Sequence, residues 1–283
     1  MPINWNVRAL RRKPRYQDVY LAYLDVLGFK NLMKRYAKES PRHLVRLFEK
    51  IDDAVHHPRE SGLVQQYLSD SILIWCTRPS SLPYMFDVCN MLQDELLLEG
   101  CLIRGAIVSG QHYWGYFDQL NLATGARNKQ SGEIIISPAL VKAYLIESKL
   151  WEPVIKIEGS VLIDHNSLFK GLPRKLRPPR KRFSPARLYD LPGYLLSLRF
   201  GVLRAGASSS QRPSKKWQVH PDVKKEIAAI KQIRRRILSG IENSDPKIAR
   251  KWKYVRKMFN SRVRPLTKSW DLMGDITIDR YAV

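Results

Sequence analysis

The stretch VYLAYLDV, residues 19–26, followed at once by LGFK, residues 27–30, decides how this chain is interpreted. Its first part is a short apolar run rich in aromatic and β-branched residues, which is typical of a buried strand. Gly28 interrupts the run, and a helix is expected to begin just beyond it. Asp25 therefore stands near the end of a strand, beside a turn whose backbone N–H groups can approach phosphates.

A second carboxylate, Asp70, lies between two further strand-like runs. Residues 63–68 and 71–76 are both apolar and are separated only by Ser69 and Asp70, so the sequence predicts a hairpin. If this hairpin and the first strand are neighbours in one sheet, Asp25 and Asp70 project from the same edge. Two nearby carboxylates repel each other unless a cation lies between them, and divalent metals prefer such oxygen ligands. Either Asp taken alone is equally what a turn or a cap requires.

The remaining pattern predicts an α+β protein. Apolar residues repeat at helical spacing from Leu82 to Leu98 and stop before Gly100, and Pro138 marks the start of a helix that reaches Glu147. Strands and helices in this order favour helices on one face of a mostly antiparallel sheet. The other expected elements are helices at 31–36 and 41–55, strands at 101–109 and 133–137, and basic amphipathic helices at 221–238 and 246–262.

Charge is spread unevenly along the chain. Residues 1–150 carry 19 Lys and Arg against 15 Asp and Glu, whereas residues 151–283 carry 30 against 11, within a net charge of +23. Such a surplus suggests an anionic partner, whether nucleic acid, a phosphorylated ligand or an acidic membrane face. A solvated basic surface with no such partner explains it as well.

Cysteine usage and hydropathy favour a cytoplasmic location. Cys76, Cys89 and Cys101 are odd in number and lack metal-ligand spacing, so we expect free thiols in a reducing compartment. No apolar run is long enough for an ordinary membrane span. The basic N-terminus also lacks the apolar stretch of a secretory signal.

Three short motifs resemble those of the class III adenylyl and guanylyl cyclases. YLDVLGF (23–29) resembles the Phe-x-Asp-Ile-x-Gly-Phe motif of this family, and SDSIL (69–73) resembles its Gly-Asp-Ser-Ile-Leu hairpin. RGAIVSG (104–110) resembles its Arg-x-Gly-Ile-x-x-Gly strand. The resemblance implies a ferredoxin-like palm as the α+β core, and a homodimer whose active sites form between protomers.

The resemblance also implies roles for individual residues. The metal ligands would be Asp25, Asp70 and the carbonyl group of Val26, which together hold two Mg²⁺ or Mn²⁺ ions. Arg104 would join Asp25 and Asp70 as a catalytic residue. The residues implied to bind substrate are Val26, Leu27, Gly28, Phe29 and Gln66, the last standing four positions before the second Asp, where ordinary cyclases recognise the base.

Within this class the chain is most similar to the pyrimidine cyclases of bacterial Pycsar anti-phage systems. LDVLGFK (24–30), RGAI (104–107) and SPALVKAYLIE (137–147) resemble motifs of that subgroup, and residues 251–260 resemble its closing helix. The resemblance implies that UTP, in preference to CTP, is converted to a 3′,5′-cyclic nucleotide and pyrophosphate. The cyclic nucleotide would act as a second messenger that activates a separate effector.

The sequence departs from ordinary cyclases at the residues that stabilise the transition state. Those enzymes carry Asn-x-x-x-Arg on the later helix, and in the Pycsar-like alignment these positions fall on Val141 and Leu145. A second alignment places Asn121 at the Asn position, with Arg127 offset by two residues. The positive charge must then come from Arg104, Arg127, Lys129 or the basic second half.

Two other functions stay open from the sequence. Residues 224–236 and 250–264 provide basic surfaces for a nucleic-acid-binding protein, although no recognised DNA-reading motif is present. An inactive cyclase-like module for regulation or dimerisation is the other alternative. The predicted organisation is a basic N-terminal arm (1–17), a class III cyclase core (18–204) and a linker with basic helices (205–283).

Overall fold

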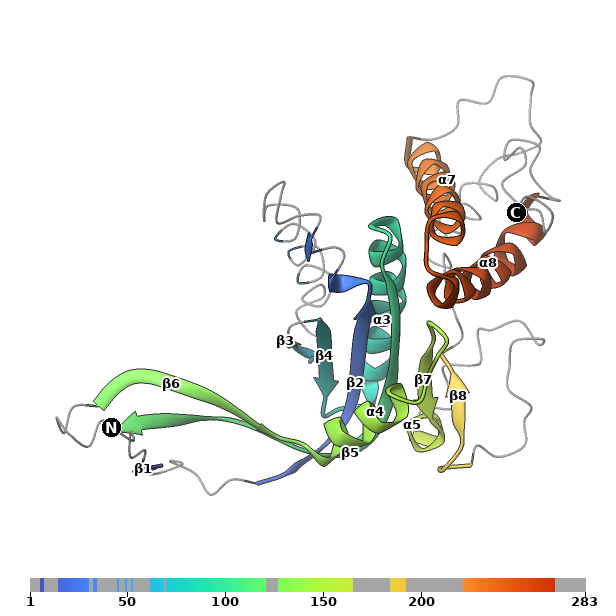
Figure 1. Cartoon of the computed structure of the whole chain (residues 1–283). Helices are drawn as coiled ribbons and strands as arrows, with labels where there is room; N and C mark the ends of the chain where they lie inside the picture. The colour runs from blue at the N-terminus through green and yellow to red at the C-terminus, as the bar shows by residue number, and fades with distance from the viewer. Residues whose placement is uncertain are drawn as a thin grey trace.

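The computed structural model describes residues 15–30, 62–68, 70–120, 127–164, 184–191 and 221–267, together with the isolated positions 6–7, 33–34, 45, 49 and 52. The described strands form one eight-stranded sheet, with helices packed against it (Figure 1). The predicted helices at 31–36 and 41–55 fall almost entirely outside the described residues. No helix in the described part is both long enough and apolar enough to cross a membrane.

The centre of the sheet is β2 (Gln17–Leu27), which pairs with β4 (Ser71–Cys76) on one side and with β5 (Leu102–Leu120) on the other. The strand order is β3-β4-β2-β5-β7-β8. β7 runs parallel to β5, so the sheet is mixed. The remaining strands are β1 (Asn6–Val7), β3 (Val64–Leu68), β6 (Arg127–Ile136), β7 (Ile155–Glu158) and β8 (Leu188–Asp190).

One face of the sheet is covered by α3 (Leu82–Leu98), which follows a short 3₁₀ turn, η1 (Pro79–Ser81). Residues 22, 24 and 26 of β2 point to this face and join α3 in the larger buried cluster. The helix ends as predicted, because Gly100 adopts a φ of 84° and donates its N–H to the carbonyl oxygen of Leu97 at 3.0 Å. The next residue, Cys101, then begins the path into β5.

The other face of the sheet carries α4 (Pro138–Glu147). Helices therefore lie on both faces of the sheet, whereas the sequence pattern favours helices on one face only. Alternate residues of β2, including Val19 and Leu21, pack here against Ala139 and Ala143 of the helix. The side chain of Ser137 caps the helix by accepting the N–H of Leu140 at 2.9 Å. The middle of β2, residues 19–24, is therefore covered on both faces, which is why this stretch is apolar and aromatic without polar alternation.

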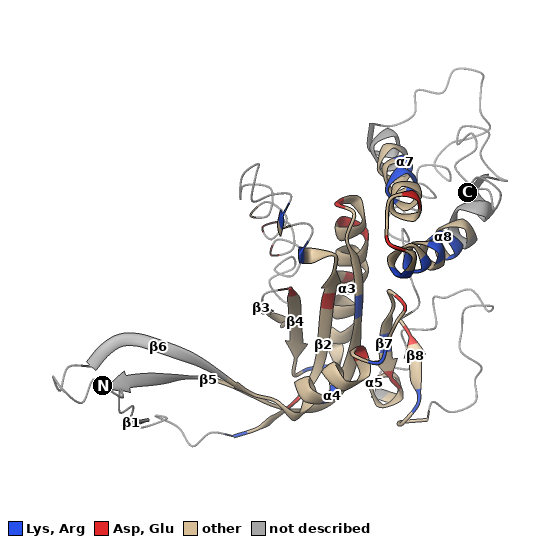
Figure 2. Cartoon of the chain, in the orientation of Figure 1, with Lys and Arg blue, Asp and Glu red and all other residues tan. Residues whose placement is uncertain are grey.

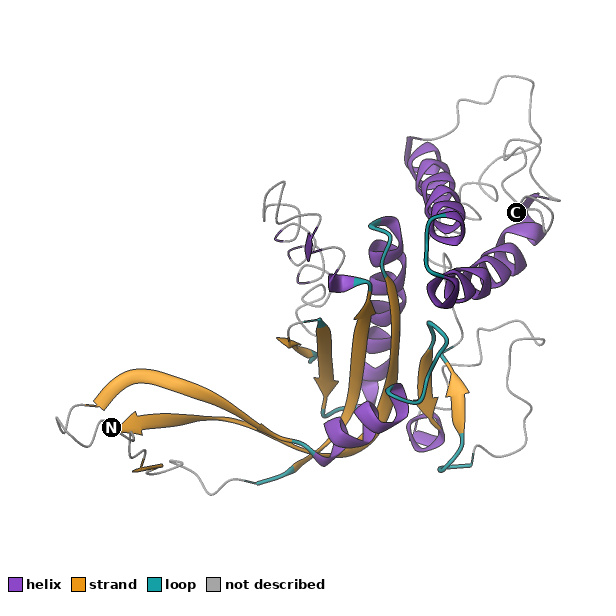
Figure 3. Cartoon of the chain, viewed as in Figure 1, coloured by secondary structure: helices purple, strands orange, loops and turns teal. Residues whose placement is uncertain are grey.

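The strand expected at residues 101–109 is much longer in the structure. β5 continues to Leu120 and turns back as β6, forming a long hairpin that projects beyond the helices (Figure 3). The predicted strand ends at Ser109, directly before Gly110. Gly110 instead sits against Ala139 of α4, where a Cβ atom would lie 3.3 Å from the Ala139 Cβ, so the glycine allows close packing without ending the strand.

The two basic helices pack on the core. α7 (Pro221–Glu242) buries Ile230, Ile233 and Ile237, and its Arg236 donates from Nε to the carbonyl oxygen of Leu98 at the end of α3, at 3.0 Å. α8 (Pro246–Thr267) follows after a short turn, and Lys and Arg line the outer sides of both helices (Figure 2). A short helix, α5 (Gly159–Asp164), connects β7 to the chain beyond it. The division into arm, core and tail stays a prediction, but α7 and α3 are in direct contact.

Candidate active site

The structure places Asp25 and Asp70 at the ends of neighbouring strands. The predicted hairpin is present: Leu68 pairs with Ser71, leaving a two-residue turn that contains Asp70. In the next strand pair, Asp25 stands opposite Ser71, and the N–H of Val26 donates to the carbonyl oxygen of Asp70 at 2.9 Å. The Asp70 side chain is exposed, while that of Asp25 is 18% exposed.

Arg104 lies directly against Asp25, because the two residues are opposite each other in the β2–β5 pairing. Its Nε is 3.0 Å from Oδ2 of Asp25 and also forms an ion pair with Glu147 at the end of α4. Its Nη1 donates to the carbonyl oxygen of Leu150 at 2.8 Å. These contacts leave the guanidinium little freedom, so its positive charge is held at the Asp25 carboxylate.

Glu147 is almost completely buried beside this pair. Burial raises the pKa of its carboxyl group, the charge of Arg104 opposes that shift, and the charge of Asp25 adds to it. A buried carboxylate persists at such a position only when it is paired, and Arg104 supplies the pairing. Glu147 therefore holds Arg104 at the same Nε atom that Asp25 contacts, and its side chain is hydrogen-bonded to Asp25 as well.

Tyr23 lies close to the negatively charged side chains at this edge of the sheet. Its hydroxyl forms a 2.9 Å hydrogen bond with Oγ of Ser71, and its ring meets Tyr144 of α4 edge-on, with centroids 6.0 Å apart. Burial raises the pKa of the Tyr23 phenol, the Ser71 bond lowers it, and the charges of Glu147, Asp25 and Asp70 all raise it. Three carboxylates thus act on one phenol, and Arg104 is paired with two of them, Asp25 and Glu147.

The donor set at this edge suits a hard divalent cation. Mg²⁺ is commonly held by one or two carboxylates together with phosphate oxygens of the substrate, and Asp25, Asp70 and the Val26 carbonyl supply oxygen donors of this type. No cluster of three or more His, Cys, Asp or Glu side chains arranged to hold a metal occurs within the described ranges. The residues therefore fit Mg²⁺ or Mn²⁺ that shares its coordination with a substrate, and not a metal enclosed by protein ligands alone.

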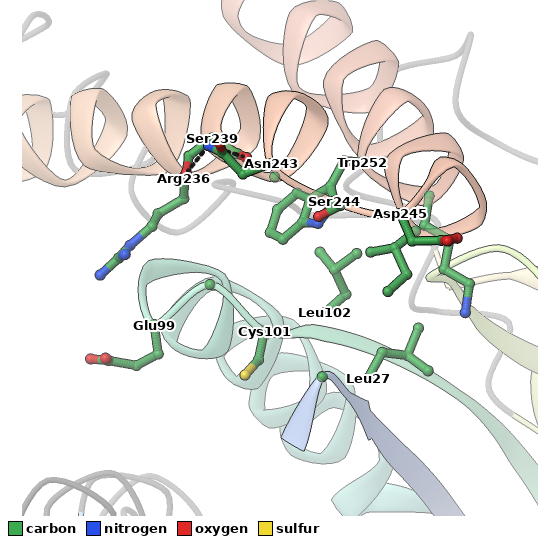
Figure 4. Close-up of a pocket in the computed structure, with 15 residues that line it drawn as sticks. Leu27, Glu99, Cys101, Leu102, Arg236, Ser239, Asn243, Ser244, Asp245 and Trp252 are labelled. Carbon is green, nitrogen blue, oxygen red and sulfur yellow. Dashed lines mark hydrogen bonds between the residues drawn. The ribbon is translucent and has the colours of Figure 1, made fainter. Parts of the chain in front are cut away.

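The turn after Asp25 opens toward a cavity of about 640 Å³ (Figure 4). Gly28 adopts a φ of 90°, which a side chain would strain, and it lines this cavity together with Leu27. The Phe29 side chain turns the other way and packs on the core cluster beneath α3. Opposite Leu27 and Gly28, the wall of the cavity is formed by the α7–α8 turn and by Trp252 and Lys251 of α8.

The remaining predicted residues are distributed as follows. Gln66 of β3 stands opposite Leu73, which in turn stands opposite Tyr23, so Gln66 shares the sheet face of Asp25. Val141 and Leu145 are 58% and 52% exposed on the outer side of α4. Asn121 and the side chains of Arg127 and Lys129 lie outside the described residues.

Sequence reasoning missed Glu147 and the Leu150 carbonyl group as partners of Arg104, and it named the basic second half as a source of positive charge without singling out Lys251. A signal for Glu147 was present: with Ala139 and Ala143 it occupies positions four residues apart on one helical stripe, and all three are buried. A carboxylate on a buried stripe requires a buried partner. No comparable local signal exists for Lys251, which resembles the other lysines of α8.

Comparison with known proteins yields structural likenesses only. No protein-family model matches this sequence, and no curated protein matches it. Among solved structures, the catalytic core of a rhodopsin-guanylyl cyclase with converted specificity, in complex with ATPalphaS, is 16% identical with a TM-score of 0.39, covering 55% of this chain and 83% of that one. The adenylyl cyclase CyaB from P. aeruginosa is 15% identical with a TM-score of 0.39, covering 57% and 84%.

A third likeness is the guanylate cyclase domain of RhGC from Catenaria anguillulae in complex with GTP, at 16% identity and a TM-score of 0.39, covering 55% of this chain and 84% of that one. These TM-scores are below 0.5 and the identities are below 25%. The α+β class with a mixed sheet is evident from the strand order itself, and function is argued below from the side chains of this chain.

Proposed function

We propose that this chain is a class III nucleotide cyclase, a lyase that converts a nucleoside triphosphate into a 3′,5′-cyclic nucleotide and pyrophosphate. The observation that carries the proposal is the placement of Asp25 and Asp70 on neighbouring strands, with Arg104 held against Asp25. The Leu27–Gly28 turn lies directly beside them and opens into a cavity. Paired carboxylates, a fixed cation and a glycine turn that borders a cavity together suit a polyphosphate substrate.

The proposed reaction is an intramolecular displacement. The 3′ oxygen of the ribose attacks the α-phosphorus and loses its proton, and the bond from the α-phosphorus to the bridging oxygen of pyrophosphate breaks. Two divalent cations bound by Asp25 and Asp70 would lower the pKa of the attacking hydroxyl and neutralise charge on the leaving pyrophosphate. Arg104 would bring a fixed positive charge to the phosphates, held in place by Glu147 and the Leu150 carbonyl oxygen.

We further propose a pyrimidine substrate, UTP before CTP, and a cyclic nucleotide that signals to a separate effector in anti-phage defence. This part rests on the sequence resemblance of residues 24–30, 104–107 and 137–147. Gln66 is the candidate for reading the base, because an amide both donates to and accepts from a pyrimidine edge. Its position on the Asp25 face of the sheet is consistent with that role.

The active species is proposed to be a homodimer. Val141, Tyr144 and Leu145 expose apolar surface along the outer side of α4, and Ile136 exposes more just before that helix. Exposed apolar residues that cluster in this way are suited to burial against another protein surface. A second copy of the chain is the proposed occupant, since class III sites form between two protomers.

A single assay tests these proposals together. Purified protein is incubated with Mn²⁺ and each of the four ribonucleoside triphosphates, and products are identified by mass spectrometry. Cyclic UMP as the main product is the expected result. A purine cyclic nucleotide as the main product would overturn the pyrimidine assignment alone, and the absence of a cyclic product from all four substrates would overturn the cyclase proposal.

A further inference from the structure

The helix α8 is fixed beside the residues that hold Arg104. The guanidinium carbon of Arg250 lies 4.6 Å from the centroid of the Trp151 ring, and the Tyr254 ring meets the same indole edge-on, with centroids 6.1 Å apart. Trp151 directly follows Leu150, whose carbonyl oxygen accepts a hydrogen bond from Arg104. The contacts of Arg250 and Tyr254, which flank Lys251 in the sequence, therefore attach α8 to the loop at Leu150 and Trp151. This is the loop whose carbonyl oxygen holds Arg104.

Because α8 is attached to this loop, Lys251 lies close to the candidate active site. Lys251 precedes Tyr254 by three residues, so the two lie on the same side of the helix. It lines the cavity that Leu27 and Gly28 line from the opposite wall. The neighbouring Trp252 is 5% exposed, packs its indole ring against Gly240 of α7 and lines the same cavity (Figure 4).

The charges around Lys251 are those of the site already described. Burial lowers the pKa of its ammonium group, the charge of Arg104 lowers it further, and the charges of Asp25 and Glu147 raise it. Three charged groups of the Asp25 edge, namely Arg104, Asp25 and Glu147, thus act on this one side chain of α8. Arg236 is the other cation that lines the cavity among the described residues, and its Nε donates to the carbonyl oxygen of Leu98.

The site also lacks a cation that ordinary cyclases supply from α4. The helix positions that carry Asn and Arg in those enzymes are Val141 and Leu145 here, and both are exposed and apolar. Cyclisation moves negative charge onto the departing pyrophosphate, and a fixed cation near it stabilises the transition state. Among the described residues at the Asp25 edge, Arg104 provides one such charge, and a second cation near the phosphates would add to its effect.

We propose that Lys251 binds the terminal phosphates of the nucleoside triphosphate at the site of its own Asp25, which makes the basic α7–α8 pair part of the catalytic machinery. The inference rests on the cyclase proposal and adds to it the residue that contacts the leaving group. A Lys ammonium group is a common phosphate ligand and acts as a point charge. The basic α7–α8 pair then has one functional cation, Lys251, on the side of α8 that lines the cavity. The exposed lysines of α8 have no part in this role.

Equilibrium binding of 3′-deoxynucleoside triphosphates tests this assignment, because these analogues lack the attacking hydroxyl and cannot cyclise. For each of the four bases, the affinity for the 3′-deoxynucleoside triphosphate is compared with the affinity for the corresponding monophosphate. Both affinities are measured for the wild-type protein and for Lys251→Ala. We expect Lys251→Ala to weaken triphosphate binding about tenfold and monophosphate binding very little, since only the triphosphate carries the groups that Lys251 contacts. Lys251→Arg should restore most of the lost affinity.

The matched control is Lys253→Ala, which removes the same charge from an exposed position two residues away on α8. Equal triphosphate affinity in the Lys251→Ala and Lys253→Ala proteins would overturn the inference. The proposed function would still stand if the wild-type protein forms a cyclic nucleotide. Equal losses for triphosphate and monophosphate would also overturn it, because they indicate a displaced helix and not a phosphate contact. A wild type that binds none of the triphosphates would remove the cyclase proposal and this inference together.

Discussion

Asp25 and Asp70 have the same proposed role but different surroundings, and both should be indispensable. We expect Asp25→Ala or Asp70→Ala to reduce cyclic-nucleotide formation more than about 100-fold, because loss of even an outer-shell partner of a metal ligand costs 10–100-fold. Both variants should remain folded, since Asp70 is exposed and Arg104 keeps its partner Glu147 when Asp25 is lost. Product yield and the elution volume in size-exclusion chromatography measure the two effects. Substantial product from either variant would contradict the two-metal assignment.

Two buried cysteines lead to a prediction about thiol reactivity and about how stability depends on pH. Burial raises the pKa of the Cys76 and Cys89 thiols from 9.0 to about 12, and no disulfide links them. At pH 8 both should therefore be unreactive toward a thiol reagent in the native protein and react once urea unfolds it. Because the folded-state pKa lies above the unfolded value, the unfolded chain loses these protons first, and stability should fall as pH rises from about 9 to about 12. Rapid labelling of the native protein would show that these thiols are accessible.

At the scale of elements, the contact between α7 and α8 depends on one glycine. A Cβ atom added at Gly240 would overlap the indole ring of Trp252, which is buried and cannot move aside freely. Gly240→Ala should therefore destabilise the protein by about 1–3 kcal/mol. The better helix propensity of alanine offsets about 1 kcal/mol of this cost, so a net loss is expected only where the overlap costs more than that.

Urea unfolding followed by circular dichroism measures this effect, and Ser239→Ala is the control, because the preceding side chain is exposed. Unchanged stability in Gly240→Ala would show that the helices separate without cost. If Lys251 binds phosphate, Gly240→Ala should also weaken triphosphate binding, since it displaces the helix that carries this lysine.

The predictions for the whole molecule concern the basic tail and the dimer. Removing residues 215–283 should abolish activity or solubility, because it uncovers the surface of α3 on which α7 packs and deletes Lys251. The matched comparison is a full-length protein with Lys247, Lys253 and Lys257 changed to Gln, which removes three exposed charges of α8 without touching its buried side. That variant should keep its activity. A truncated protein that cyclises UTP or CTP normally would refute the prediction.

Activity should also depend on association of two chains. If each site needs residues from two protomers, specific activity should fall as the protein is diluted through the concentration at which the dimer dissociates. Analytical ultracentrifugation at the same concentrations supplies the comparison. Val141→Glu, which places a charge on the exposed apolar side of α4, should shift both curves to higher concentration. Full activity in a verified monomer would rule out a shared site.

Local sequence signals account for the elements that surround the site. β2, β4 and α3 could be predicted because apolar runs and helical periodicity are properties of neighbouring residues. The two-residue turn at Asp70 and the stop at Gly100 follow from turn and cap chemistry, which is local as well. For the same reason, the length of β5 could not be predicted, because Gly110 interrupts the pattern locally while packing against α4 supports the strand.

The sequence by itself determined the α+β class, the strand that ends at Asp25, the hairpin that presents Asp70 and the resemblance that suggests a cyclase. Only the tertiary structure decided that α4 covers the second face of the sheet, that Glu147 meets Arg104, and that Lys251 faces Leu27 and Gly28 across one cavity. The reason is physical: periodicity shows which side of an element is buried, but not against which distant element it is buried. Lys251 and Lys253 are equivalent in local pattern, and only the packing of Trp252 and Tyr254 turns the first inward and leaves the second in solvent.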